Sequence, residues 1–276
     1  MTALFESRSP RVRAYYFDAA GNHVVLGMLR RSGITPEEAL GILRGADRTP
    51  LAEHPSDVYC ILYREHGALR ARFFNPDGSR EDLCGNALRC VPFVLADRGE
   101  PHERVPVHTG VGVVWALHLG SGVGGVEIPT DGFSVTDSTE PDEVLVGVGT
   151  PHRVRFVADL EDPALGVLGR QWSRSELPVA ATFVKLEGTT LCVRSFERGV
   201  PRETGSSGTA AIAACVAEAH RAPDEAREFR DVRFPGAQRL RIRFDRARRT
   251  VLLYGACRLE FCCDLVTEGE RLACSG

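Results

Sequence analysis

The sequence predicts a mixed α/β protein made of two similar halves, each with more strand than helix. Short runs in which apolar and polar residues alternate recur along the whole chain, as is typical of strands with one solvent-facing side. Only three segments combine helical spacing with good capping residues. Two of these helices begin in the same way, at a small polar residue followed by glycine, and each comes after a strand and a polar turn.

Strand-like runs are found in both halves, and because most of them alternate we expect mixed or antiparallel sheet. In the first half they cover 11–19, 23–29, 57–65, 69–75, 104–110, 113–120 and 123–129. In the second half they cover 144–149, 152–157, 180–187, 190–197, 238–244 and 250–261.

The first predicted helix starts at Thr35, where Pro36 takes the first helical position and Glu38 completes a capping box. The second helix starts at Cys84 and the third at Ser207, and both are long apolar stretches. The segments that lead into these two helices are also alike, so the chain looks like a repeat of one unit.

This internal similarity predicts two like domains of ordinary size. We place the N-terminal domain at 1–120 and the C-terminal domain at 121–259, with a glycine-rich crossover between them. The last strand, about 260–276, is expected to return to the first domain. A cleft between the domains would bring the two helix starts, Cys84 and Ser207, face to face.

Composition and charge narrow the class of partner. A formal charge of −3 over 276 residues, with a pI near 6.3, gives no polycationic surface for nucleic acid or anionic lipid. No apolar run is long enough for a membrane helix, and the first residues lack the apolar core of a signal peptide. The nine cysteines form no C-x-x-C pairs. We expect a cytoplasmic protein that binds a small, amino-acid-like molecule, with neither nucleic acid nor membrane as partner. Whether the protein forms a homodimer is left open by the sequence.

Cys84, Gly85 and Asn86 stand at a helix start, where free backbone N–H groups and the positive end of the helix dipole stabilise an anion. The same field lowers the pKa of a thiol, so Cys84 is a candidate thiolate base. Gly85 lets the backbone approach a ligand closely, and Asn86 can accept from an ammonium group or donate to a carboxylate.

Ser207, Gly208 and Thr209 repeat this arrangement at the third helix, with hydroxyl groups in place of the thiol. Two helix starts facing one cleft would cradle a carboxylate, with a proton-handling group on either side of the adjacent carbon. That arrangement suits removal of an α-proton from one face and return of a proton to the other. Ser207 is equally well interpreted as an ordinary N-cap.

Four ordered motifs resemble those of diaminopimelate epimerases. FFNPDGSREDLCGNALRC is similar to the first signature of that family, and FERGVPRETGSSGTAA is similar to the second. DAAGNHVVL and VGTPHRVRFV lie where the family has its G-N-D-F and G-N-P-H turns. The resemblance implies two pseudo-symmetric α/β domains, each a mostly antiparallel or mixed sheet around a central helix. It also implies racemisation in the cleft between them, with no cofactor and no metal.

The resemblance further implies roles for individual residues. Cys84 matches the first catalytic thiol, and Ser207 stands where the family has its second catalytic cysteine. The other matched positions would bind the substrate, and they are Asn22, Asn75, Gly85, Asn86, His152, Glu197, Arg198, Gly208 and Thr209. Of these, Glu197 and Arg198 match the pair that recognises the amino and carboxylate groups at the far end of the substrate.

Several departures from the family pattern predict a different substrate or an altered mechanism. Ser207 is a much poorer base than a thiol. Thr150 and Ala180 stand where the family has asparagines, and a histidine replaces the acidic residue of the first turn. One additional residue in ERGVPRET is expected to displace Pro201 and Arg202 into or beside the rim of the cleft.

Three functions follow from these observations. The first is racemisation or epimerisation at the α-carbon of an amino acid or amino-acid-derived acid, with the Cys84 thiolate on one face and Ser207 opposite. Diaminopimelate itself stays open as a less favoured substrate. The second is a double-bond isomerase or dehydratase working from a single base, as in the 2-methylaconitate isomerase-like, phenazine-biosynthesis-like and 3-hydroxyproline dehydratase-like groups. The third is a binding protein that has kept the fold and lost the chemistry.

Overall fold

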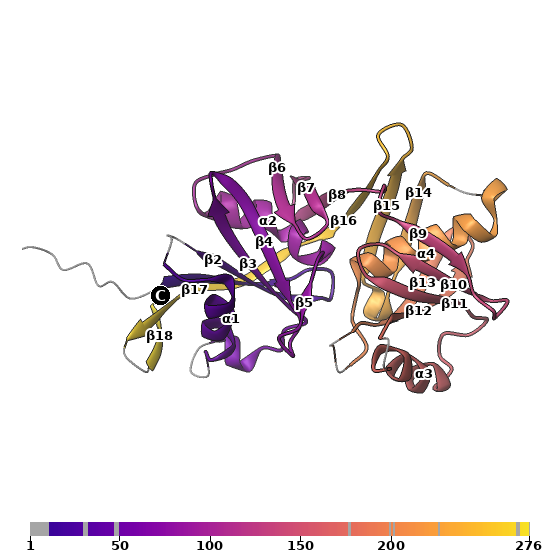
Figure 1. Cartoon of the computed structure of the whole chain (residues 1–276), viewed down its shortest axis with the longest axis horizontal. Coiled ribbons are helices and arrows are strands. Elements are labelled where there is room, and N and C mark those ends of the chain that lie inside the picture. The colour runs from indigo at the N-terminus through magenta and orange to yellow at the C-terminus, as the bar shows by residue number, and fades with distance from the viewer. Residues whose placement is uncertain are drawn as a thin grey trace, which may run out of the picture.

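The structure is a computed structural model that describes residues 11–29, 33–46, 50–175, 178–198, 200, 202–225, 227–268 and 271–275. It has the mixed α/β architecture predicted from the sequence, and strands dominate it. Figure 1 shows two lobes side by side along the long axis, with the earlier strands in one lobe and β9 to β15 in the other. Among the described residues, no helix has both the length and the apolar composition needed to cross a membrane.

The elements of the first lobe follow one another as a unit of strands with two helices. They are β1 (Arg11–Asp18), β2 (His23–Leu29), α1 (Pro36–Arg44), β3 (Val58–Glu65), β4 (Ala68–Phe74), β5 (Arg80–Glu81), α2 (Gly85–Asp97), β6 (Arg104–Thr109), β7 (Gly112–His118) and β8 (Val123–Pro129). A short 3₁₀ helix covers Pro50–Glu53.

The second lobe has a corresponding set of elements. They are β9 (Ser134–Asp137), β10 (Glu143–Gly147), β11 (Pro151–Phe156), α3 (Ala164–Ser173), β12 (Ala180–Glu187), β13 (Thr190–Phe196), α4 (Gly208–Arg221), β14 (Phe229–Arg233), β15 (Arg239–Asp245) and β16 (Thr250–Ala256). Short 3₁₀ helices cover Pro223–Glu225 and Pro235–Ala237, and the chain continues with β17 (Arg258–Glu268) and β18 (Arg271–Ser275).

The two units pair their strands in the same order and in the same sense. In the first, β1–β2 and β3–β4 are antiparallel, whereas β2–β3 and β4–β6 are parallel. In the second, β10–β11 and β12–β13 are antiparallel, whereas β11–β12 and β13–β14 are parallel. The units meet where β8 pairs antiparallel with β16, so one hydrogen-bonded ladder runs through both lobes. The repeat expected from the sequence is therefore present at the level of sheet topology.

The C-terminal part of the chain crosses back between the lobes. The predicted strand over 250–261 is two strands, β16 and β17, with Cys257 between them. β17 leaves the junction and pairs antiparallel with β1, so the first lobe is completed by residues from the end of the chain. The domain boundaries at residues 120 and 260 stay a prediction.

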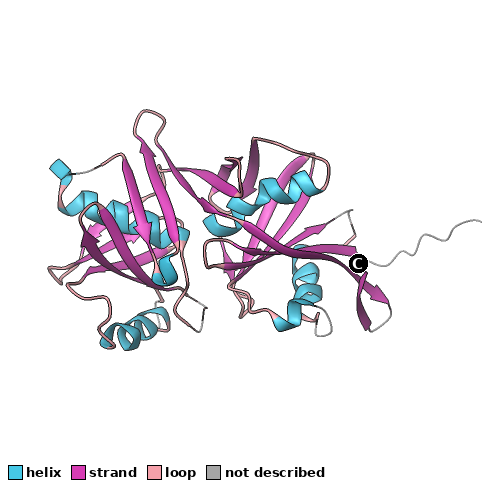
Figure 2. Cartoon of the chain, turned by 180° about the vertical axis from the view of Figure 1, so that it is seen from behind, coloured by secondary structure: helices cyan, strands magenta, loops and turns pink. Residues whose placement is uncertain are grey.

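Helices α2 and α4 are the central helices of the two lobes, and the sheets curl around them (Figure 2). Most residues of both helices are buried, and their apolar side chains belong to one hydrophobic cluster shared by the two lobes. The helix starts approach each other at Gly85 and Gly208, where a Cβ atom would lie within 2.4 and 2.6 Å of the Leu253 side chain. The absence of a side chain at both glycines lets the two helix starts pack together at the junction of the lobes.

Helix α1 agrees with the sequence-based expectation, whereas several other elements were not predicted. Helix α1 has the predicted capping box, since the Thr35 hydroxyl accepts from the Glu38 backbone and the Glu38 carboxylate accepts from the Thr35 backbone. Helix α3 was not predicted, and neither were the strands β5, β9 and β14. The single last strand expected over about 260–276 is instead the end of β17 followed by β18. The helix count from the sequence was therefore too low for the second lobe, where α3 takes the place that α1 has in the first.

Arg89 is a charged residue in the middle of the apolar face of α2, and none of its surface is exposed. Its guanidinium donates to the carbonyl oxygen of Ala256 at 3.0 Å, to that of Ala19 at 3.1 Å and to Asn86 Oδ1 at 2.8 Å. One side chain thus joins α2 to the turn after β1 and to the end of β16.

We predict that Arg89→Leu lowers the free energy of unfolding by several kcal/mol. Leucine leaves two buried acceptors, the carbonyl oxygen of Ala19 and Asn86 Oδ1, without the donor that Arg89 supplies, and each such group costs about 1–3 kcal/mol. Urea unfolding followed by circular dichroism measures the change. A matched substitution of the exposed Arg80 should alter stability by less than about 0.5 kcal/mol, and an equal loss in both variants would contradict the role given to Arg89.

Candidate active site

A pocket lies at the junction of the lobes, where the starts of α2 and α4 meet. Its lining comes from both lobes and consists of Asn22, Asp57, Val58, Asn75, Glu81, Leu83, Cys84, Gly85, Asn86, Thr150, Glu197, Arg198, Gly208 and Thr209. Most of the residues that the sequence singled out are thus brought together, although they are far apart along the chain. Ser207 and His152 do not line this pocket.

Cys84 is the N-cap residue of α2 and has extended backbone angles, φ −133° and ψ 104°. Its side chain makes no capping hydrogen bond with the described backbone, so the half-buried thiol is left to face the pocket. Burial raises the pKa of Cys84 to about 12, and the nearby Glu197 carboxylate raises it too. The backbone N–H groups of Ala87 and Asn86 favour the thiolate but are outweighed. The predicted low pKa is therefore wrong for this structure, and Cys84 is a neutral thiol at neutral pH.

Ser207 is the N-cap residue of α4, and it is completely buried. Its Oγ atom accepts from the backbone N–H of Ala210 at 3.1 Å and donates to Glu197 Oε1 at 2.7 Å. The hydroxyl group is therefore committed to the helix cap and to Glu197, which itself lines the pocket. Glu197 lines the pocket beside the start of α4, whereas Ser207, which donates to it, does not.

Glu197 follows β13 and has an environment that makes its carboxyl unusually basic. Burial raises the pKa of Glu197 to about 7, and the carboxylates of Asp57 and Glu81 act in the same direction. The hydrogen bond from Ser207 opposes them, because it stabilises the ionised form. A carboxyl group that titrates near neutral pH is suited to act as a general base or acid.

Asn22 and Asn86 connect the two lobes rather than standing free in the pocket. Their side-chain amides donate to one acceptor, the backbone oxygen of Ser206, at 3.3 and 3.2 Å. This carbonyl lies immediately before the N-cap of α4, so the first lobe holds the start of that helix in place. Asn22 Oδ1 is buried and has no hydrogen-bond partner within the described part of the chain, which leaves it able to accept from an ammonium group.

Glu81 is a pocket residue that the sequence analysis did not single out. Arg198 Nη2 donates to both of its oxygens, at 2.9 and 3.0 Å, across the gap between the lobes. Asn75 Nδ2 donates to Glu81 at 3.1 Å, and Thr150 Oγ1 donates to it at 3.4 Å. The side chains expected to hold the far end of a substrate are therefore engaged with a carboxylate of the chain itself.

Asp57 is the other acidic residue of the pocket that was missed. It accepts from the backbone N–H of His23 at 2.8 Å and forms an ion pair with Arg202, which comes from the second lobe. Arg202 thus lies beside the site, as its predicted place at the rim requires. Pro201, predicted to lie there as well, is outside the described residues.

His152 and Ala180 lie behind the pocket in the second lobe, and both are almost fully buried. His152 Nδ1 is 3.0 Å from Thr182 Oγ1, and burial together with the charge of Arg198 lowers the pKa of His152 to about 3. His152 is therefore a neutral side chain of the core in this structure. A direct contact between His152 and a substrate stays a prediction.

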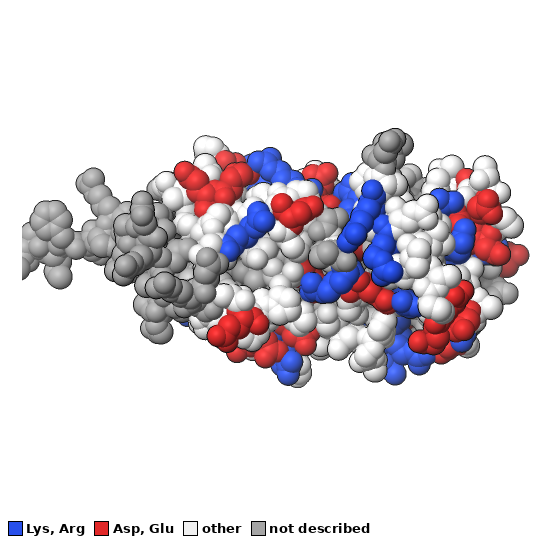
Figure 3. Space-filling model, turned by 90° about the horizontal axis from the view of Figure 1, so that it is seen from below, with Lys and Arg blue, Asp and Glu red and all other residues white. Residues whose placement is uncertain are grey.

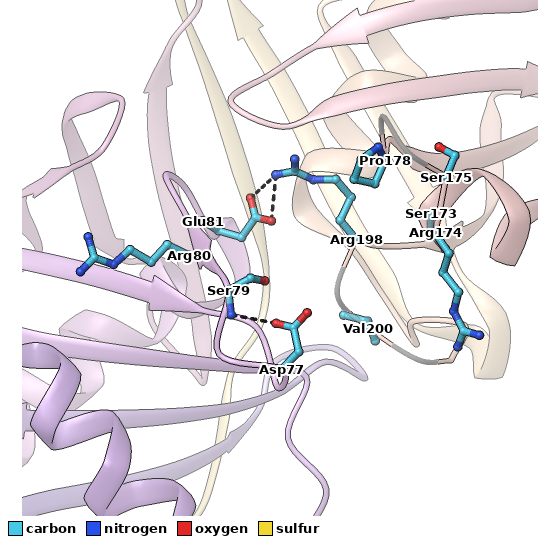
Figure 4. A pocket seen from close by; sticks show the side chains of 10 residues that line it. All are labelled: Asp77, Ser79, Arg80, Glu81, Ser173, Arg174, Ser175, Pro178, Arg198 and Val200. Atoms are coloured by element: carbon cyan, nitrogen blue, oxygen red, sulfur yellow. Dashed lines mark hydrogen bonds and ion pairs between the residues drawn. The ribbon is translucent and has the colours of Figure 1, made fainter.

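A second, larger cavity of about 500 Å³ lies outside the pocket and shares two of its residues, Glu81 and Arg198. Figure 4 shows the ion pair between them, with Asp77 to Arg80 on one side and residues of the α3 end on the other. Basic side chains gather near the middle of the molecule when it is seen from below, with acidic ones next to them (Figure 3). The Glu81–Arg198 pair thus stands between the inner pocket and the outer cavity.

The arrangement has the groups that proton transfer next to a carboxylate would need. The starts of α2 and α4 supply backbone N–H groups that can hold an anion, while Cys84 and Glu197 supply two groups that exchange protons. In the described part of the chain no three His, Cys, Asp or Glu side chains are grouped as metal ligands.

The chain is similar in sequence to several diaminopimelate epimerases. The chain is 34% identical over 212 residues to the diaminopimelate epimerase of Archaeoglobus fulgidus, a match that covers 64% of this chain and 74% of that protein. It is also 34% identical over 185 residues to the diaminopimelate epimerase of Methanothrix thermoacetophila. That match covers 58% of this chain and 63% of the relative, less than two thirds of its length. The chain matches no protein-family model.

Solved structures with the same fold are more distant in sequence. A hydroxyproline epimerase from Agrobacterium vitis superposes with a TM-score of 0.66 at 12% identity, covering 95% of this chain and 94% of the other. A methylitaconate-delta-isomerase superposes with a TM-score of 0.54 at 15% identity, covering 95% of this chain and 97% of the other. At these identities the likeness concerns the fold.

Proposed function

This chain belongs to the diaminopimelate epimerase family, and we propose that it is a cofactor-independent isomerase that inverts the α-carbon of an amino acid or amino-acid-derived acid. The observation that carries the proposal is that Cys84 and Glu197 line one pocket, together with the starts of two central helices. Cys84 is the proton-handling group of the first lobe, and Glu197 is that of the second.

In the proposed reaction, the backbone N–H groups at the helix starts bind the carboxylate of the substrate. The ionised Glu197 takes the α-proton from one face, and the negative charge left on the carbon spreads into the bound carboxylate. The Cys84 thiol then gives its proton to the opposite face. One C–H bond breaks and another forms on the other side, so the carbon is inverted. The protein is left with protonated Glu197 and a Cys84 thiolate, and the reverse reaction uses this pair.

The surroundings of the two groups support these roles. The raised pKa values of Cys84 and Glu197, about 12 and about 7, give a neutral thiol as proton donor and a partly ionised carboxyl as base at neutral pH. The thiolate that forms is stabilised by the backbone N–H groups of Ala87 and Asn86 and by the charge of Arg89. In this scheme Ser207 is a positioning residue, since it holds Glu197 and caps α4.

We predict that the pH dependence of the wild-type rate has an acid limb near pH 7, where Glu197 becomes ionised, with activity rising as pH rises. Ser207→Ala should move this limb to higher pH by about one unit. A hydrogen bond to a charged group contributes about 1.5–3 kcal/mol, and 1.36 kcal/mol corresponds to one pKa unit. The profile of kcat/KM against pH measures the shift. An unmoved limb, with kcat merely lowered, would mean that Ser207 acts without Glu197.

The test of the proposed function is proton NMR in deuterium oxide with a panel of amino acids, hydroxy-amino acids and unsaturated acids. Loss of an α-proton signal, followed by chiral analysis that finds both configurations, is the expected result. A new vinyl signal in place of inversion would support a double-bond isomerase or a dehydratase instead. If some compounds bind but none exchanges its α-proton, the result supports the hypothesis that the chain is a binding protein without catalytic activity.

A further inference from the structure

We propose that Glu81 is a built-in carboxylate that fills the far end of the pocket, so that the substrate is an amino acid with a single carboxylate. The inference rests on the proposed function, because it describes what the same pocket accepts. Glu81 is then a specificity-determining residue. The sequence-based expectation was different, namely that Arg198 binds a second carboxylate of the substrate.

The contacts of Glu81 carry the argument. Arg198 donates to both carboxylate oxygens, Asn75 donates to one and Thr150 to the other. These three donors come from three different segments. The resemblance to the family had placed substrate-binding side chains at Asn75 and Arg198, and Thr150 stands where the family has an asparagine. Arg198 Nη2, Asn75 and Thr150 are therefore engaged with Glu81, whereas the buried Arg198 Nε has no hydrogen-bond partner among the described residues.

Burial makes this arrangement difficult to displace. The Glu81 side chain is 13% exposed and that of Arg198 is 28% exposed, so the pair is partly shielded from water. A substrate carboxylate that took over Arg198 would leave the partly shielded Glu81 carboxylate without its cation, which is unfavourable. Two carboxylates close to one guanidinium would also repel each other.

The Glu81–Arg198 pair lies where the inner pocket adjoins the outer cavity. Glu81 and Arg198 line the inner pocket beside Cys84 and Glu197, and they also line the outer cavity of about 500 Å³ (Figure 4). A substrate side chain that extends from the α-carbon toward the outer cavity therefore passes this pair. The inner pocket is lined by the carboxyls of Asp57, Glu81 and Glu197, and the guanidinium groups near it, those of Arg198 and Arg202, are already paired with Glu81 and Asp57.

The experiment compares amino acids that differ only in the second carboxylate. Lysine is diaminopimelate without one carboxylate, and norleucine is 2-aminopimelate without one carboxylate. Binding of all four is measured by calorimetry in a Cys84→Ala background, with and without Glu81→Ala or the isosteric Glu81→Gln. Glu103→Gln, at an exposed position outside both cavities, is the matched control.

With Glu81 present, we expect each monocarboxylate to bind at least about tenfold more tightly than its dicarboxylate. Both Glu81 variants should reverse the order, because Arg198 becomes free to bind the second carboxylate, and Glu103→Gln should leave it unchanged. Tighter binding of the dicarboxylates with Glu81 in place, an order that does not change in the variants, or no binding of either monocarboxylate would overturn the proposal.

Proton exchange by the unmodified chain, measured on the same four compounds, separates this proposal from the proposed function. The expected binding order without any exchange would leave the assignment of Glu81 intact and contradict the isomerase function. Exchange of the dicarboxylates in preference to the monocarboxylates would support the isomerase function and contradict the assignment of Glu81.

Discussion

Replacing Cys84 with alanine is expected to lower the rate of α-proton exchange by about 10²–10⁴-fold, the usual contribution of a positioned acid or base. Cys84 is the thiol that faces the pocket at the start of α2, and its raised pKa makes it the proton donor for one face of the substrate carbon. Alanine removes the donor and leaves the helix start intact. The rate is measured by loss of the α-proton signal in deuterium oxide.

The control for this prediction is another cysteine outside the pocket. Cys262→Ala changes a partly exposed thiol on β17, so it should leave the rate within a few-fold of the wild type. Circular dichroism and thermal unfolding establish that both variants fold. If Cys84→Ala keeps a wild-type exchange rate, the thiol is not the proton-handling group of the first lobe.

Glu197→Gln is expected to lower the same rate by about 10²–10⁴-fold, again the range for a general base. Glutamine has the shape of glutamate, and its carbonyl oxygen can accept the hydrogen bond that Ser207 now donates to the carboxylate at 2.7 Å. The site should therefore keep its geometry while losing its base. Any residual activity should also lose the acid limb near pH 7, because the group that titrates there is gone.

Glu140→Gln is the matched control for this second prediction, since Glu140 is exposed and lies in neither cavity. The Ser207→Ala variant adds a graded comparison, because it keeps the carboxyl but removes its hydrogen-bond donor. We expect the loss to be larger for Glu197→Gln than for Ser207→Ala. A larger loss of rate for Ser207→Ala than for Glu197→Gln would indicate that the Ser207 hydroxyl, and not Glu197, is the proton-handling group.

The sequence predicted the repeat and the place of Cys84 because both depend on local signals. Alternating strands and helix starts with Cys-Gly and Ser-Gly can be recognised within a short window. Helix α3 was missed because its segment contains Gly166 and Gly169, which disfavour a helix. A Cβ atom at Gly169 would lie 2.3 Å from the Phe196 ring, so the packing of the lobe requires glycine there.

The electrostatics of the site could not be predicted from local sequence. The helix start does favour the Cys84 thiolate, as expected, but the extent of burial decides the pKa, and burial depends on the whole fold. The role of Glu81 was hidden for a similar reason. It sits in a polar turn of the first lobe, and its cation, Arg198, is 117 residues away in the second lobe. The basic Glu197 likewise depends on a buried position that its sequence neighbours do not reveal.

The most direct test of the central claim is the position of deuterium during the first turnovers in deuterium oxide. In the proposed mechanism, Glu197 removes protium from one face of the α-carbon, and the Cys84 thiol, which carries deuterium from the solvent, delivers deuterium to the other face. At early times, the inverted product should therefore contain deuterium while the recovered starting amino acid still contains protium. Deuterium that enters the starting amino acid as fast as product forms, or a product that retains protium, would contradict the account.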